Sequence, residues 1–410
     1  RCTAQDAAGR EARSRLAWLD ISLPQRSTAS LTETFPAVFR LVTNREITLP
    51  PFSVTSTLPS IMNGGKDFSA WSKNDALLYR TLRLPVETVL GRDGVRLADA
   101  GIAESRFEKG EDITSRMLSL VQRMGEIQRD GTPDIEFAVT GLLCRSLMAA
   151  GEPEDARRAL EQIRARFISQ GETRFLPNID ALLCRIALRT GDLDDVDAWY
   201  REKAPRDALH LNVMKRYQYF TQAMAELSAG KPDAALLTLA PLESYCKTCA
   251  RYIDGIHLGV LRAIALYRKK DSAWKDSLTA ALAEAESFGF IRTVSVYRAA
   301  VLPLLEALGE TGSARWYKKL LSDVRIQAAY YPRFLQPRLA PGEELTAAER
   351  QVLSLLCADK SNAEIGEIMD IKLTTVKTHV SHILDKLGVS RRSEAKTAAQ
   401  KLRLVPEDRS

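Results

Sequence analysis

The chain has 410 residues, of which 45% are hydrophobic, 27% charged and 7% aromatic, and its formal net charge is +6. One hydrophobic core rarely serves so long a chain, so we expect two to four domains, rich in helix and neither disordered nor built as a β-sandwich. No apolar run reaches about 18 residues and the N-terminus has no signal-peptide pattern, which argues against a membrane partner and predicts a cytoplasmic protein.

Residues 1–65 show the least regular pattern. Glu11 to Leu19 is compatible with a helix, but Leu49-Pro50-Pro51 and Asn63-Gly64-Gly65 interrupt any long element. We therefore expect this segment to be loop, or the remnant of an upstream domain. The chain begins with Arg1 rather than Met, and we interpret this start as a sign that an upstream part is missing.

Residues 66–335 repeat with a period of about 40. Turn signals recur after 41, 40, 39, 40 and 39 residues, at Gly110, Gly151, Gly191, Gly230, Lys270 and Gly309. Each block has a helix-turn-helix pattern, with expected second helices over 154–167, 193–203 and 233–242. A hairpin of two helices cannot bury both its apolar faces, so we expect the hairpins to stack into a superhelix with a concave surface. The pattern is similar to tetratricopeptide repeats, which have a shorter period of about 34 residues, with armadillo or HEAT repeats as the alternative.

Three residues of this region are candidates for a ligand-binding groove. Arg216, Tyr217 and Phe220 combine a cation with aromatic rings at helical spacing. Aromatic residues spaced in this way also form the core between repeats, and the sequence leaves both interpretations open.

We find no pattern for catalysis, a metal or a nucleotide. The chain has no phosphate-binding G-x-x-x-x-G-K-[ST] loop, no G-x-S-x-G turn and no H-E-x-x-H helix. Cys246 and Cys249 form a lone C-x-x-C without a second ligand pair. Carboxylates such as Asp192 and Asp194 stand at expected helix starts, where they act as caps. We therefore expect no enzyme activity and no cofactor.

Residues 336–344 contain two Pro and a Gly and predict a linker.

The last domain, 345–410, opens with two capping boxes. Thr346 with Glu349 and Ser361 with Glu364 each place a hydroxyl three residues before a Glu, which predicts the starts of two helices.

A third helix follows with one apolar and one polar face. Its apolar residues recur at helical spacing and predict a buried stripe: Val376, Val380, Ile383 and Leu387. The opposite side carries Thr374, Lys377, Thr378 and Ser381 and is free to face a partner. Gly388 then predicts a helix end, and a last amphipathic helix carries Ala395, Ala398, Ala399 and Leu402. A tight turn between two helices, with a polar face on the second, is typical of a helix-turn-helix DNA-binding unit.

Charge along this domain favours the same interpretation. From residue 371 to residue 405, eight basic residues stand against two acidic ones. From residue 341 to residue 370, two basic residues stand against seven acidic ones. The positive charge is therefore concentrated where the phosphates of DNA would lie.

These motifs resemble the LuxR-type family of DNA-binding domains. The matching residues are Leu345-Thr346, Glu349, Val352-Leu353, Ser361-Asn362, Glu364-Ile365, Thr375-Val376-Lys377, His379 and Lys386-Leu387-Gly388-Val389. Ala348, Asp359, Gly366 and Lys372 depart from the residues that the family usually carries. Lys372 replaces a Ser that caps the recognition helix, and Thr374 is the alternative cap.

The resemblance implies a set of DNA contacts. Lys377, Thr378 and Ser381 stand where the family contacts base edges, while Thr374, Thr375, Lys386, Arg391 and Arg392 are the candidates near phosphate. It also implies that the last helix pairs two copies as a homodimer on DNA, through the small face of Ala395, Ala398 and Ala399 beside Leu402.

A helical superhelix before such a domain is similar to the sensor region of MalT-like regulators. The resemblance implies an all-α bacterial transcription regulator, in which the repeats sense a small effector or a partner protein and the last domain binds double-stranded DNA. A protein-interaction scaffold and the C-terminal part of a larger, signal-controlled ATPase are the alternatives.

Overall fold

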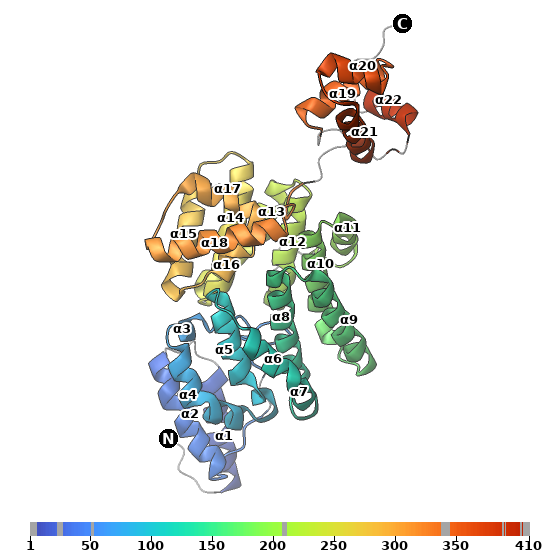
Figure 1. Ribbon diagram of the computed structural model, residues 1–410. Helices are drawn as coiled ribbons and strands as arrows, with labels where there is room; N and C mark the ends of the chain where they lie inside the picture. The colour runs from blue at the N-terminus through green and yellow to red at the C-terminus, as the bar shows by residue number, and fades with distance from the viewer. Residues whose placement is uncertain are drawn as a thin grey trace. The chain divides into compact units, whose positions relative to one another are not determined.

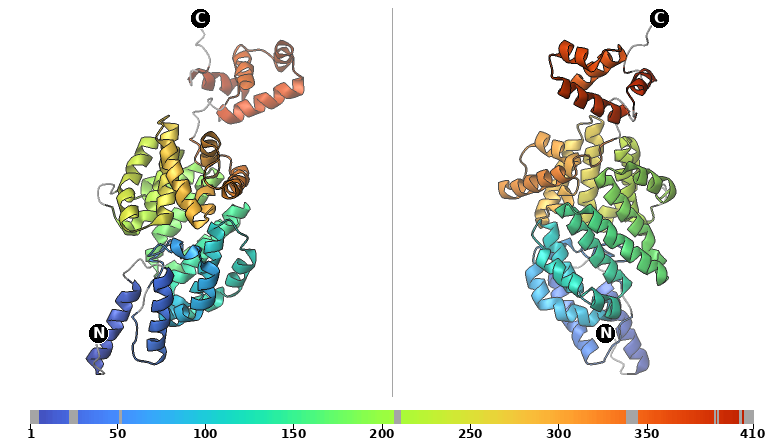
Figure 2. Two further views of the ribbon diagram at one scale, coloured as in Figure 1. Left: turned by 90° about the vertical axis from the view of Figure 1, so that its left-hand side faces the viewer. Right: turned by 45° about the vertical axis from the view of Figure 1, so that its right-hand side comes forward.

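The computed structural model describes residues 6–22, 28–50, 53–206, 211–337, 345–387, 389, 391–401 and 404. The chain divides into two compact units, Arg1–Gln336 and Pro337–Ser410 (Figures 1 and 2). The described residues form helices, with a single isolated bridge between Asn63 and Asp67. The predicted all-α class, with helical repeats followed by a small helical domain, is confirmed. Most of the predicted linker lies outside the described residues.

The repeats of the first unit are helical hairpins. The pairs are α8 (Pro133–Ala150) with α9 (Pro153–Ser169), α10 (Leu176–Thr190) with α11 (Leu193–Glu202), α12 (Arg216–Ser228) with α13 (Pro232–Thr248), α14 (Tyr252–Arg268) with α15 (Trp274–Phe288), and α17 (Arg298–Leu308) with α18 (Ala314–Tyr330). Each pair packs on the next, and the first helices of neighbouring pairs, α10, α12 and α14, contact one another. One continuous apolar core runs through the stack.

The predicted turn period has a backbone cause. Every predicted turn point has a positive φ: Gly110 66°, Gly151 84°, Gly191 82°, Gly230 71°, Lys270 59° and Gly309 81°. A residue with a positive φ at or just after the end of a helix reverses the chain and lets the next helix pack back on the first. Glycine takes this conformation at little cost, which explains its recurrence. The turn points read from the sequence therefore coincide with positions of positive φ.

Helices also occupy much of the segment predicted as loop. α1 (Ala7–Ser22) contains the suggested helix at 11–19, but α2 (Thr28–Thr43) was not predicted. α2 contains Pro36, a residue that argues against a helix, yet it buries Phe35 and Val38 and packs against α4 (Asp75–Leu90). Tertiary packing therefore overrides the local signal. The remaining helices before the repeats are α3 (Ser69–Ser72), η1 (Gly91–Gly94), α5 (Leu97–Glu108), α6 (Thr114–Gln122) and α7 (Met124–Asp130).

Residues 53–68, which we call the inner segment, cross the first helices of the repeat hairpins, which we call the inner helices. The Ser53 hydroxyl donates to Asp134 on α8 at 2.6 Å, and the Asn178 amide on α10 donates to the Thr57 carbonyl at 2.8 Å. On α5, the buried carboxylate of Glu104 accepts hydrogen bonds from the amides of Ile61 and Met62 at 2.7 and 3.1 Å. An irregular backbone is stable inside the protein only when its polar groups are paired, and these helices supply the partners.

The last repeat closes back on the first helices. The Ile291 amide donates to the Glu108 carbonyl at 2.6 Å, and the Gln327 side chain donates to the Ala149 carbonyl at 2.8 Å. α16 (Arg292–Ser295) packs on α5. The last repeat thus lies against α5 and α8, and the interior of the stack is lined by these helices, the repeats and the inner segment.

In the second unit, the described residues form four helices around a small core. They are α19 (Ala347–Cys357), α20 (Asn362–Met369), α21 (Leu373–Leu387) and α22 (Arg392–Lys401). α21 contacts each of the other three. The buried apolar residues that form the core of this unit are Leu345, Val352, Leu353, Leu356, Ile365, Val376, Ile383, Leu387, Ala395 and Ala399.

The close approach of the inner segment to α8 predicts the effect of one substitution. A Cβ on Gly141 would lie 2.5 Å from the Pro59 carbonyl oxygen. Replacing Gly by Ala inside a helix normally stabilises the folded state by about 0.5 to 1 kcal/mol. We expect Gly141→Ala instead to destabilise the first unit by about 1 to 3 kcal/mol, because overpacking displaces the inner segment.

Gly255→Ala is the matched control, because Gly255 lies within α14 and its added Cβ meets no atom within 4 Å. It should leave stability unchanged or raise it. Thermal unfolding of the two variants measures the difference, and equal stability of both would show that Pro59 does not press on α8.

Candidate functional site

The turn between α20 and α21 positions the predicted recognition helix. Both capping boxes are present: Glu349 and Glu364 accept hydrogen bonds from the amides of Thr346 and Ser361, each at 2.7 Å. Asp370 ends α20 in the left-handed conformation with φ 52°. Two short, well-capped helices and a tight turn therefore fix where α21 begins.

α21 has the rotation that its sequence predicts. Val376, Ile383 and Leu387 are buried, and Val380 is half-buried. The opposite face is exposed and consists of Thr374, Thr375, Lys377, Thr378 and Ser381. The suggestion that Thr374 caps the helix is wrong, because α21 begins one residue earlier, at Leu373. The Lys372 carbonyl accepts from the amides of Thr375 and Val376 at 2.9 and 3.1 Å.

Lys386 belongs to the framework of the domain. Its Nζ lies 2.9 and 2.7 Å from the two carboxylate oxygens of Glu349, whose side chain is buried. Burial opposes the ionisation of Glu349, but Lys386 and the Thr346 amide outweigh it and lower the pKa of the carboxyl to about 2. The ammonium therefore holds α21 against α19, and its contact with phosphate stays a prediction.

Arg392 is also engaged within the domain. One of its guanidinium nitrogens donates to the Asn362 side chain at 2.8 Å, and another donates to the Lys360 carbonyl. These bonds tie α22 to the start of α20. Arg391 is exposed, as is Lys372 beside the start of α21. Lys372 is one of the basic residues counted from 371 to 405, and it departs from the family pattern. Its exposure beside α21 makes it a further candidate for a phosphate contact.

The small face of α22 does not face outward. Ala395 and Ala399 are fully buried in the core of the domain, and Ala398 is partly buried against it. The prediction that Ala395 and Ala399 form a pairing surface is therefore wrong, since another copy cannot reach them without unfolding the domain. The prediction for Leu402 lies outside the described residues. The exposed side of α22 carries Ser393, Glu394 and Thr397.

The three candidate residues of the repeats line one cavity. Arg216, Tyr217 and Phe220 all border a hollow of about 70 Å³ inside the first unit. Phe220 is buried, and Tyr217 is partly buried with the Arg185 guanidinium stacked 3.6 Å from its ring centre. Arg216 is only 4% exposed, which the groove hypothesis did not anticipate.

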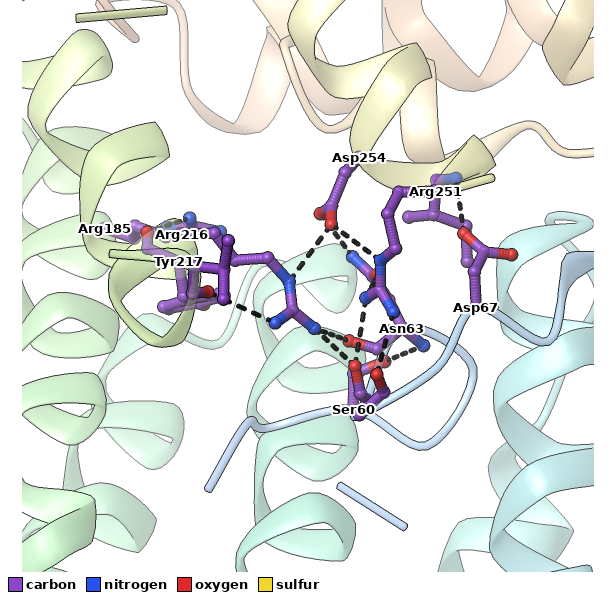
Figure 3. A network of polar contacts seen from close by, with 12 residues as sticks. Ser60, Asn63, Asp67, Arg185, Arg216, Tyr217, Arg251 and Asp254 are labelled. Atoms are coloured by element: carbon purple, nitrogen blue, oxygen red, sulfur yellow. Dashed lines mark hydrogen bonds and ion pairs between the residues drawn. The ribbon is translucent and has the colours of Figure 1, made fainter. Parts of the chain in front are cut away.

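Arg216 is held by an ion pair and by the inner segment. Its Nε donates to the Asp254 carboxylate at 3.1 Å, and another guanidinium nitrogen donates to the Gly64 carbonyl (Figure 3). Arg251 donates to the same carboxylate at 3.2 Å and to the Gly64 carbonyl at 2.9 Å. Both guanidinium groups therefore hold the turn at 63–65, and the protein itself satisfies Arg216.

Comparison with known proteins identifies the two parts of the chain. Residues 119–311 match the family model of the MalT-like TPR region, and residues 343–399 match that of bacterial regulatory proteins of the luxR family. The chain thus joins a MalT-like TPR region to a LuxR-family helix-turn-helix domain, as the resemblance implied.

Its relatives include proteins named HTH-type transcriptional regulator MalT. The protein from Cronobacter sakazakii is 27% identical over 295 residues, which are 66% of this chain and 32% of the relative. The protein from Yersinia pestis strain Pestoides F is 26% identical over 321 residues, which are 73% of this chain and 34% of the relative. The chain therefore spans about a third of the length of these relatives. No solved structure matches it significantly. Among the described residues, no helix is long and apolar enough to cross a membrane.

The Glu349–Lys386 pair predicts a pH-dependent stability of the second unit. Removing the cation with Lys386→Met should destabilise the unit by about 1 to 3 kcal/mol at pH 7, because a buried carboxylate loses its charged partner. The folded pKa of Glu349, about 2, lies below its ordinary value of 4.5. Its contribution is therefore full above about pH 4.5 and is lost as the pH falls towards 2, so the difference from the natural protein should shrink over that range.

Hydrogen exchange of the α19 and α21 amides in the full chain measures this effect. Lys360→Met is the control, because Lys360 forms an exposed pair with Glu364 at 3.3 Å and its loss should change little. Equal effects of the two substitutions would mean that the buried pair does not support α21.

Proposed function

We propose that the chain is part of a bacterial transcription regulator, in which the helical repeats sense a signal and the LuxR-type domain binds double-stranded DNA. One observation carries the proposal: α21 exposes a continuous polar face while Val376, Ile383 and Leu387 anchor its other side. A helix presented in this way, after a tight turn, fits the major groove. The luxR family match and the names of the MalT relatives support the same function.

The proposed contacts follow from exposure. Lys377, Thr378 and Ser381 would face base edges, because they lie on the exposed side of α21. Thr374, Thr375, Lys372 and Arg391 are exposed around the same helix start and would contact phosphates. Lys386 and Arg392 complete the proposed phosphate contacts, although both also hold the domain together.

The remaining parts of the function are also proposals. We propose that two copies act together on DNA, through a surface other than Ala395 and Ala399, because the few base contacts of one α21 need a second half-site to be specific. A regulator of bacterial genes acts in the cytoplasm. The repeats would respond to a small effector or to a partner protein. A protein-interaction scaffold would bind DNA only through charge, so sequence-dependent binding separates it from a regulator.

Lys377→Ala tests the proposed base contact. A duplex preferred by the full chain is first selected from a random library, and affinity is then measured on this duplex and on singly mismatched ones. The variant should keep its melting temperature and lose about 1 to 3 kcal/mol of binding free energy, with weaker discrimination at one position. Loss of affinity that is equal for all duplexes would place Lys377 at a phosphate instead.

Val376→Ala tests the rotation of α21 by affecting stability rather than base preference. Val376 is fully buried, so the truncation should lower the stability of the second unit by about 0.5 to 3 kcal/mol. At a temperature where the unit remains folded, base discrimination should match that of the natural protein. An altered base preference at full stability would show that α21 is rotated differently.

A further inference from the structure

The interior of the first unit contains a cavity with an excess of positive charge. The cavity has a volume of about 70 Å³ and lies between α5, α8, α10, α16 and α17. Five arginines and one carboxylate line it: Arg145, Arg185, Arg189, Arg292, Arg298 and Glu108. His257 also borders it, and burial lowers the pKa of its imidazole to about 4, so it is neutral at pH 7.

Two of the five arginines are paired with carboxylates. Arg145 contacts Glu108 at 2.6 Å and also contacts the buried Glu104. Arg292 lies 3.3 Å from Asp323. These pairs neutralise one part of the wall, as buried charges in a protein usually require.

The other three have no carboxylate partner among the residues that the structure describes. Arg185 donates to the Thr221 hydroxyl at 2.8 Å and to the Tyr217 carbonyl at 2.9 Å. Arg189 donates to the Arg185 carbonyl at 2.7 Å. These partners are neutral, so the positive charge of both side chains remains uncompensated.

Arg298 has the least favourable surroundings. Its side chain is 2% exposed, and its hydrogen bonds go to the neutral Gln327 side chain at 3.2 and 3.3 Å and to the Met148 carbonyl at 3.4 Å. Its Nη1 is buried without a hydrogen-bond partner, as is the Nε of Arg189. Its backbone also has a positive φ of 49°, which is costly for a residue with a side chain.

The three guanidinium groups affect one another. Burial, together with the neighbouring Arg185, lowers the pKa of Arg189 to about 10, which leaves it charged at pH 7. Burial and then Arg189 lower the pKa of Arg298. The ring centre of Phe334 lies 5.7 Å from the guanidinium carbons of both Arg189 and Arg298. The ring centre of Tyr331 lies 4.3 Å from the guanidinium carbon of Arg298. Aromatic faces attract cations but carry no net charge, so they offset only part of the repulsion.

We propose that this cavity binds a small oxyanion, a molecule that carries a phosphate or carboxylate group, and that this anion is the ligand to which the repeats respond. The role as a signal rests on the proposed function, whereas the binding itself does not. A guanidinium presents paired N–H donors that match both groups. The cavity is small, so it fits a metabolite-sized ion rather than a peptide or nucleic acid. Arg298 Nη1 and Arg189 Nε are buried donors without a partner, so the protein itself does not fully satisfy these two guanidinium groups.

Two other buried arginines nearby differ from Arg185, Arg189 and Arg298 because they are paired with a carboxylate. Arg216 and Arg251 share the buried Asp254 and bind the inner segment, so that they need no ligand (Figure 3). Arg185, Arg189 and Arg298 have no equivalent acid among the described residues. The protein thus neutralises one cluster itself and leaves the other for an anion.

The test is thermal unfolding of the full chain with inorganic phosphate or citrate, against chloride at the same ionic strength. We expect at least one of the two anions to raise the melting temperature of the first unit by several degrees, and titration calorimetry to give saturable binding. The anion that acts more strongly separates phosphate from carboxylate recognition. If neither stabilises more than chloride, the inference is wrong.

Arg189→Gln and Arg298→Gln distinguish an anion site from a structural role. Each removes an uncompensated buried charge, so without phosphate or citrate the variants should melt at the natural temperature or above it. Their response to the anion should be lost or reduced at least tenfold in affinity. Lower stability with an unchanged anion response would contradict the proposal.

Arg325→Gln is the matched control. Arg325 lies on α18 with its side chain 59% exposed and pairs with Glu306 at 3.2 Å, so its loss should leave the anion response intact. DNA affinity measured with and without the anion tests the signalling role separately. Anion binding without a change in DNA affinity would remove that role only, and specific DNA binding without anion binding would refute the cavity while leaving the proposed function in place.

Discussion

The first unit depends on the buried carboxylate of Asp254. It accepts hydrogen bonds from Arg216 and Arg251, and both guanidinium groups bind the carbonyls of the inner segment. Burial alone would raise the pKa of Asp254, but the two arginines outweigh this effect and lower it, so the carboxylate stays ionised. Stacked hairpins leave polar groups of their inner helices facing the interior, and this ionic group pairs them with an irregular backbone instead of water.

The interior therefore has one part in which the charges are paired and another in which positive charge is left unpaired. Around Asp254 and Glu104, every strong charge that we describe has a partner in the protein. Around Arg298, three cations remain without one, and Arg298 also has an unfavourable backbone conformation. Natural proteins tolerate such costs mainly at functional sites, since folding alone gives no reason to retain them. Arg298 itself is buried, and a low local dielectric strengthens any charge interaction that it makes.

In the second unit, basic residues that hold the helices together lie close in sequence to basic residues that are free to face a partner. Lys386 and Arg392 have the charge expected of DNA contacts, yet their side chains bond Glu349, Asn362 and the Lys360 carbonyl. Lys377, on the exposed face of α21, projects away from the core. Basic charge alone therefore does not identify a phosphate contact, because a cation that joins two helices of a small domain is already engaged.

Patterns of short range were readable from the sequence. The turn period, both capping boxes and the rotation of α21 follow from residues within one or two helical turns of each other, where geometry is fixed by local backbone and apolar spacing. For Arg216, Tyr217 and Phe220 the sequence left a groove and the core between repeats both open. The structure places all three at one cavity and pairs Arg216 with Asp254. Features made by distant residues were not readable. The hydrogen bond from Ser53 to Asp134 joins residues 81 apart, and the Lys386–Glu349 pair joins residues 37 apart. The helix at α2, the burial of Ala399 and the unpaired cluster around Arg298 depend likewise on which elements meet, and only the tertiary structure decides that.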